Sequence, residues 1–182
     1  MVKLSLLYGL GISIGGAVLI LILYFLGYHS DLDKFIAIQT PTMLISYAII
    51  IVGLVLGMRA VREQSPDHSL SYGRAVGAGA LITLFSGLFS AVFVLIYGLV
   101  LNPEYHDLIY RMQLAKMEEK GVPPDQMDAA EPMMRLFSGP VFMALMSVIM
   151  SPIFGTLLSL IIAIFVKRAP ATTPPPIGSA RA

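Results

Sequence analysis

Apolar residues in this chain form four long runs that are separated by polar stretches. The runs cover residues 4–27, 35–58, 75–101 and 141–166. Each run is long enough for a helix to cross a hydrocarbon core of about 30 Å, which takes about 20 residues. The longest polar stretch, 102–135, separates the third run from the fourth. The pattern predicts an all-α polytopic membrane protein with four transmembrane helices and an extramembrane helical loop between helices 3 and 4.

The composition supports this prediction. Only 13% of the residues are charged, about half of the share in soluble globular proteins. We expect a single four-helix membrane domain over residues 1–168, followed by a disordered proline-rich tail over 169–182, which has no apolar face. A signal peptide is the alternative for the first run, but the run is too long and no small-residue cleavage motif follows it. The net charge of +1 gives no indication of nucleic-acid binding. The absence of cysteine excludes disulfides and thiolate metal sites.

Basic residues concentrate on one side of the predicted membrane. The side that carries both termini and the loop after the second run has seven Lys and Arg against two acids, whereas the other side has five against nine. Because Lys and Arg are retained on the cytoplasmic side, we expect both termini in the cytoplasm. The residues predicted to fix this topology, or to meet lipid head groups, are Arg59, Arg62, Arg74, Lys167 and Arg168.

Small residues recur at four-residue spacing in every run. Such stripes let helices approach closely, and they suit either a compact four-helix bundle or a homo-oligomer. The segment 11–15 also matches the Gly-x-Ser-x-Gly pattern of serine hydrolases, but that motif requires a strand-to-helix turn, whereas this one lies inside an unbroken apolar run. The predicted helix-packing residues are Gly11, Gly15, Gly53, Gly57, Gly73, Gly77, Ser151, Gly155 and Ser159.

The predicted span cores contain no charged residue and no histidine, although such residues usually mark ion or substrate paths in membranes. Hydroxyl side chains are the polar groups that remain, and we expect them to bond to helix backbone rather than line a pore. Pro152 should bend the fourth span, because proline removes a backbone donor. The hydroxyl residues are Ser46, Thr83, Ser86, Ser90, Ser147, Ser151 and Thr156.

The polar loop begins with Asn102-Pro103-Glu104, which predicts a helix N-terminus capped by Asn102. The helix should continue to Lys120 and end at Gly121. Its apolar face predicts an amphipathic helix that lies on the membrane or caps the other helices. That face consists of Tyr105, Leu108, Ile109 and Met112. A second short helix is predicted over 125–131, ended or bent by Pro132.

Glu104, His106 and Asp107 lie close together in the sequence, as metal ligands often do. On a helix, however, His106 points about 100° away from Asp107 and about 160° away from Glu104, so the three cannot converge on one ion. A metal site assembled across loops, with His29, Asp31 and Asp33, is the alternative. We expect solvated loop acids instead, with Asp107 paired to Arg111 four residues later, and no metal or cofactor.

Several segments together resemble the domain of unknown function 4199 family of bacterial membrane proteins. They are MLISYAIIIVGLVLGMRAVRE, SLSYGRAVGAGALITLFSGLFS, Asn102-Pro103-Glu104-Tyr105 and MEEKGVPPDQMD. The resemblance covers about residues 4–168, although Pro123 stands where the family usually has a polar N-cap. It implies four membrane helices with an outer helical loop in a bacterial inner (cytoplasmic) membrane. It implies no known activity, catalytic residue or cofactor.

The sequence therefore favours a non-enzymatic structural or interaction protein whose biochemical activity is unknown. Its expected partners are the lipid bilayer and either a second copy or another membrane protein, with the acidic outer loop as a contact surface. A component of small-solute permeation or transport is the alternative, and it requires a hydrated path past Ser46, Thr83 and Ser147. An enzyme would require His29, Asp31 and His106 to meet at the membrane boundary.

Overall fold

The computed structural model describes residues 1–65 and 67–168, so the predicted disordered tail lies outside the described residues. Within these described residues, four helices are long and apolar enough to cross a membrane: α1 (Val2–Phe25), α2 (Leu32–Glu63), α3 (Tyr72–Ile96) extended by the π-helical turn η1 (Tyr97–Leu101), and α6 (Pro140–Val166). Two shorter helices, α4 (Tyr105–Glu119) and α5 (Pro124–Ser138), connect η1 to α6. Within the described residues, strand-like pairing is limited to one bridge between Leu70 and Arg168. The prediction of an all-α polytopic membrane protein is confirmed.

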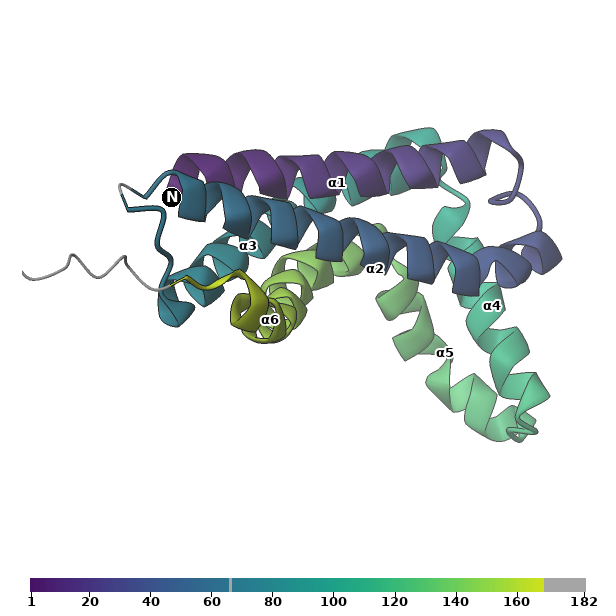
Figure 1. The fold of residues 1–182 in the computed structure, drawn as a ribbon. Coiled ribbons are helices and arrows are strands. Elements are labelled where there is room, and N and C mark those ends of the chain that lie inside the picture. Colours follow the sequence, from purple (N-terminus) through teal and green to yellow (C-terminus); the bar gives the residue numbers. More distant parts are fainter. Residues whose placement is uncertain (66, 169–182) are drawn as a thin grey trace, which may run out of the picture.

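The two ends of the long helices differ in character. The N-terminus and the α2–α3 connection lie at one end, whereas α4 and α5 form a hairpin at the other end (Figure 1). We call the first the basic end and the second the hairpin end. The basic end carries Lys3, Arg59, Arg62, Arg74, Lys167 and Arg168.

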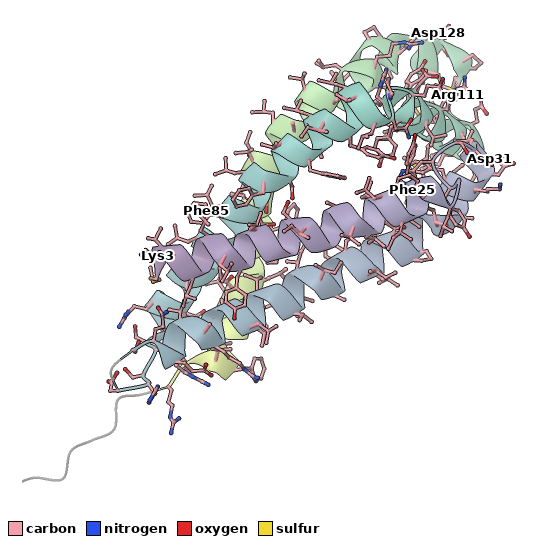
Figure 2. The ribbon with its side chains drawn as sticks, turned by 90° about the horizontal axis from the view of Figure 1, so that it is seen from above. Lys3, Phe25, Asp31, Phe85, Arg111 and Asp128 are labelled. Carbon is pink, nitrogen blue, oxygen red and sulfur yellow. The ribbon has the colours of Figure 1, made fainter. Side chains whose placement is uncertain are left out.

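The tightest packing lies in the half of the molecule next to the basic end. Leu54 and Met58 of α2 and Ile82 of α3 are fully buried there. The small side chains of Ala75 and Ala78 allow α3 to pack closely against three other helices. Toward the hairpin end, α1 and α3 separate, as Figure 2 shows between Phe85 and Phe25. This divergence leaves room for the cavity described below.

Some of the predicted small residues lie at helix contacts and others do not. A Cβ atom added to Gly53 would collide with Ile12, and one added to Gly155 would collide with Thr83. Added Cβ atoms at Gly11, Gly73 and Gly77 would meet nothing within 4 Å, so within this chain these three do not bring helices together. The remaining predicted positions lie against neighbouring helices, namely Gly15, Gly57, Ser151 and Ser159. Close contacts also occur at Gly9, Gly79 and Gly87, which the spacing argument missed.

Most membrane hydroxyls bond to backbone carbonyls, as the sequence predicted. The side chains of Thr83, Ser147 and Thr156 donate to their own helices at 2.6–3.0 Å. Ser151 instead donates across to the carbonyl of Thr83 at 2.8 Å and so joins α6 to α3. In lipid, where water cannot satisfy these groups, such bonds remove the cost of burying a hydroxyl.

Two predicted helix ends in the hairpin were wrong, and α2 extends beyond its predicted membrane span at both ends. α2 begins at Leu32, because Asp31 accepts the backbone N–H of Lys34. α4 begins at Tyr105, so Asn102 is not its N-cap; its side chain is buried and bonds elsewhere. α5 continues through Pro132 to Ser138. This proline is tolerated because the carbonyl that loses its donor belongs to the exposed Asp128, where solvent can satisfy it.

Candidate functional site

The hairpin is fixed to the long helices through one face of α4. Leu108 and Met112 pack on Phe35 in the first turns of α2, and all three side chains are at most 8% exposed. Tyr105 and Ile109 of the predicted apolar face join the same cluster. The predicted apolar face of α4 therefore packs on the start of α2.

A buried polar network lies beside this contact. His29, in the α1–α2 connection, is 5% exposed, and its Nδ1 lies 2.5 Å from the Tyr97 hydroxyl. Asn102 Nδ2 donates to the same hydroxyl oxygen at 3.2 Å and to the His29 carbonyl at 3.5 Å. Because the Tyr97 oxygen already accepts from Asn102, we assign its hydrogen to His29 Nδ1, which places the imidazole hydrogen on Nε2.

Aromatic rings surround His29. The ring centroids of Phe35 and Tyr105 lie 5.5 Å and 5.0 Å from that of His29, and the Tyr97 ring lies 5.9 Å away. Burial lowers the pKa of His29 to about 4 and raises the pKa of Tyr105. Both side chains are therefore uncharged at neutral pH, which suits them to join three segments rather than to exchange protons.

The π-helical turn positions this network. Its last bond runs from the N–H of Asn102 to the carbonyl of Tyr97 at 2.7 Å, which folds the Asn102 side chain back toward the Tyr97 ring. Tyr24 of α1 adds a bond from its hydroxyl to the Leu101 carbonyl at 3.2 Å. Single π turns are often found at functional sites, and here the turn connects α1, α3 and the hairpin.

The loop residues weighed as metal ligands are used in other ways. Asp31 caps α2, and Asp107 pairs with Arg111 at 3.3 Å, as predicted. His29 and Glu104 border a polar surface pocket of about 250 Å³, whereas His106 lies on a different cavity. Among residues 1–65 and 67–168, no three His, Cys, Asp or Glu side chains are placed to hold a metal ion.

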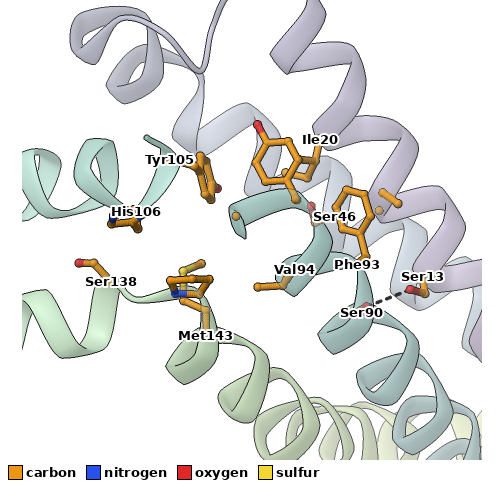
Figure 3. A pocket seen from close by; sticks show the side chains of 15 residues that line it. Ser13, Ile20, Ser46, Ser90, Phe93, Val94, Tyr105, His106, Ser138 and Met143 are labelled. Atoms are coloured by element: carbon orange, nitrogen blue, oxygen red, sulfur yellow. Dashed lines mark hydrogen bonds between the residues drawn. The ribbon is translucent and has the colours of Figure 1, made fainter. Parts of the chain in front are cut away.

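An apolar cavity of about 210 Å³ lies where α1 and α3 separate, beside the first turn of α4 (Figure 3). All four long helices and both hairpin helices contribute to its wall. The lining residues are Ser13, Gly16, Ala17, Ile20, Ser46, Ser90, Phe93, Val94, Tyr97, Gly98, Tyr105, His106, Ser138, Pro140 and Met143. Tyr97 and Tyr105 belong both to this wall and to the surroundings of His29, so the network and the cavity form one candidate site.

The chain matches one known protein family over most of its length. The sequence pattern of the family described as "Protein of unknown function (DUF4199)" matches residues 7–168. The chain belongs to this family. No curated protein and no solved structure matches the chain.

Sequence reasoning missed the main parts of this site. From the sequence, Tyr97 was not singled out as a site residue, His29 was weighed as a possible metal ligand or enzyme residue, and Asn102 was predicted to be a helix cap. One signal was present: an asparagine directly after an apolar span, five residues beyond a tyrosine, offers the two polar groups that a buried network needs. What the sequence does not show is that the α1–α2 connection folds back onto that point in this DUF4199 protein.

Proposed function

We propose that this DUF4199 protein is a non-enzymatic interaction protein of the bacterial inner membrane, with both termini in the cytoplasm. In this proposal the long helices hold the α4–α5 hairpin at the outer surface, and the hairpin binds a basic, amphipathic segment of a partner protein. The observation that carries the proposal is a groove between α4 and α5, on the part of the hairpin that does not contact α2.

The groove has a volume of about 450 Å³. Leu114, Val122 and Met127 supply apolar surface, and Glu118 and Asp128 supply carboxylates. A groove that combines apolar surface with charge of one sign suits an amphipathic segment that carries the opposite charge. The stated partner chemistry follows from this complementarity.

Side-chain contacts between α4 and α5 fix the shape of the groove. Arg135 of α5 lies 4.3 Å from the centroid of the Tyr110 ring and bonds to Glu131 at 2.8 Å. Gln113 of α4 donates to Ser138 of α5 at 3.2 Å. The Arg135–Tyr110 and Gln113–Ser138 contacts join the two helices, and the packing of α4 on Phe35 fixes the pair to the membrane helices. A partner would therefore meet a largely preformed surface, which lowers the entropic cost of binding.

A second copy of the chain is a poorer occupant for this groove. The basic end, with Arg59, Arg62 and Arg74, is separated from the hairpin by the length of the long helices (Figure 1). In a copy with the same orientation, those residues would lie on the opposite side of the membrane. The proposed orientation itself rests on the excess of Lys and Arg at that end.

The alternative of solute permeation has less support. It required Ser46, Thr83 and Ser147 to line a continuous polar path, but Thr83 and Ser147 donate to backbone carbonyls and neither borders the cavity. Ser46 does border the cavity, whose wall is mainly apolar. We therefore favour the interaction role.

Photocrosslinking in native membranes tests the proposal. With a benzophenone amino acid at Val122, we expect a crosslink to a basic segment of another protein, which Glu118→Lys combined with Asp128→Lys abolishes. Glu119→Lys is the matched control, because Glu119 is exposed on α4 and does not line the groove. Equal crosslinking in all three proteins, an acidic or neutral crosslinked segment, or a crosslink to a second copy of this chain would overturn the proposal.

A further inference from the structure

The geometry points to a second binding site: the cavity between α1 and α3 holds one acyl chain of a phospholipid from the leaflet at the hairpin end. In this inference the lipid tail lies along α1 and α3, and its head group lies at the end of the cavity near His106 and Ser138. The site is separate from the hairpin groove and does not depend on what the groove binds.

The position of the cavity along the helices matches one leaflet. On α1 the lining runs from Ser13, in the middle of the helix, to Ile20, which is about 10 Å at 1.5 Å per residue. On α3 and η1 it runs from Ser90 to Gly98, about 12 Å by the same measure. Half of a hydrocarbon core measures about 15 Å, so the cavity covers most of the depth of one leaflet and stops near the midplane.

Four of the polar side chains in the wall already have hydrogen-bond partners. Ser90 donates to Ser13 at 3.2 Å (Figure 3), Ser138 donates to the Met134 carbonyl at 2.8 Å, and the Tyr97 hydroxyl bonds to His29. A buried water needs two to four free polar partners, and the polar side chains left for it are Ser46, Tyr105 and the exposed His106. Phe93, Val94 and Met143 instead offer the apolar contacts that a hydrocarbon chain makes.

The size of the cavity selects a narrow occupant. Its volume of about 210 Å³ is below the usual range for drug-sized ligands, about 300–1,000 Å³. Gly16 lies on the wall, and a Cβ added there would meet nothing within 4 Å. The space directly beside this glycine is therefore open to an added side chain.

Fluorescence quenching by brominated lipid tests the inference, because the chain contains no tryptophan. Phe93→Trp places a reporter on the cavity wall, in vesicles of phosphatidylcholine brominated near the middle of its chains. We expect this protein to lose at least about half of its fluorescence relative to unbrominated vesicles, since a pocket encloses most of its ligand's surface. Adding Gly16→Leu should restore most of the lost fluorescence, because the leucine side chain fills the cavity and excludes the brominated chain.

Two matched controls accompany the test. Gly77→Leu also adds a side chain at an open helical glycine, which borders none of the cavities described above, and should leave the quenching of the Phe93→Trp reporter unchanged. Val92→Trp, at a neighbouring position that is 56% exposed, should be quenched with or without Gly16→Leu. If Phe93→Trp does not fold, Met143→Trp reports from the opposite wall.

The inference fails if the wall reporter is not quenched by bromine, or if Gly16→Leu leaves its quenching unchanged. The first result, together with strong quenching by acrylamide, would assign the cavity to water. The second would mean that the reporter contacts lipid outside the cavity. Neither outcome bears on the crosslinking test of the hairpin groove, so the two proposals can fail independently.

Discussion

The contact between α1 and α3 gives a sharp test of the packing, because two glycines on one helix should respond in opposite ways. Gly9 is buried against α3, where an added Cβ would lie 2.6 Å from the Ile82 carbonyl oxygen and 2.9 Å from the Ser86 nitrogen. Gly11, two residues further along, has nothing within 4 Å of an added Cβ. We therefore compare Gly9→Ala with Gly11→Ala.

The expected magnitudes follow from these distances. An ordinary contact begins at 3.4 Å, so Gly9→Ala must separate α1 from α3 by about 0.8 Å, enough to lose a quarter to a half of the local dispersion energy. Overpacking costs about 1–3 kcal/mol, and the upper half of that range applies because backbone atoms cannot rotate aside. Alanine restores about 1 kcal/mol of helix propensity. The free energy of unfolding should fall by about 1–2 kcal/mol for Gly9→Ala and rise by up to about 1 kcal/mol for Gly11→Ala.

Unfolding in mixed micelles with a rising fraction of dodecyl sulfate, followed by far-UV circular dichroism, measures both values. A difference of about 2 kcal/mol changes the folding equilibrium by a factor of about 30, which is well resolved. The reasoning would be refuted if Gly11→Ala destabilised the protein as much as Gly9→Ala. That result would mean that the four-residue stripe predicted from the sequence, which contains Gly11, forms the contact instead.

Two further predictions concern the hairpin end and the topology. Burial lowers the pKa of His29 from 6.5 to about 4, so between these pH values the unfolded state takes up a proton on His29 and the folded state does not. The free energy of unfolding should therefore fall by up to about 3 kcal/mol as the pH is lowered from 6.5 to about 4. Unfolding titrations of His29→Gln should show a shallower pH dependence, and an equal slope in the two proteins would contradict the assignment. For topology, the chain has no cysteine, so Ala115→Cys should react with an impermeant maleimide from outside intact cells, whereas Ser69→Cys should react only after lysis. Labelling of Ser69→Cys alone would reverse the proposed orientation.

The α4–α5 hairpin shows where sequence reasoning succeeded and where it failed. The periodicity of Leu108 and Met112 predicted the apolar face of α4, and that face is buried against α2. The position of Asn102 before Pro103 predicted a helix cap, but Asn102 bonds to Tyr97 and His29 instead. A cap depends on local geometry, whereas this network depends on a connection that is 68 residues from Tyr97 in sequence, so local rules could not find it.

At Pro132 and at the small residues, the structure also differs from what local sequence rules predict. Proline was expected to end or bend the second loop helix, yet α5 passes through it because solvent can satisfy the carbonyl that loses its donor. Spacing rules selected Gly73 and Gly77, whereas the contacts of α3 are made at Gly79 and Gly87. Which glycine is covered depends on how each helix is rotated toward its neighbours, and four-residue spacing alone does not specify that rotation.

By itself, the sequence determined that the chain is a polytopic membrane protein with four long helices and a helical segment between the third and fourth. It could do so because apolar length and charge placement act locally, through the transfer of each residue between water and lipid. Only the tertiary structure decided that α1 and α3 separate at one end, that His29, Tyr97 and Asn102 meet there, and that a cavity lies beside them. Those features depend on the relative positions of segments far apart in the chain, which side-chain packing sets.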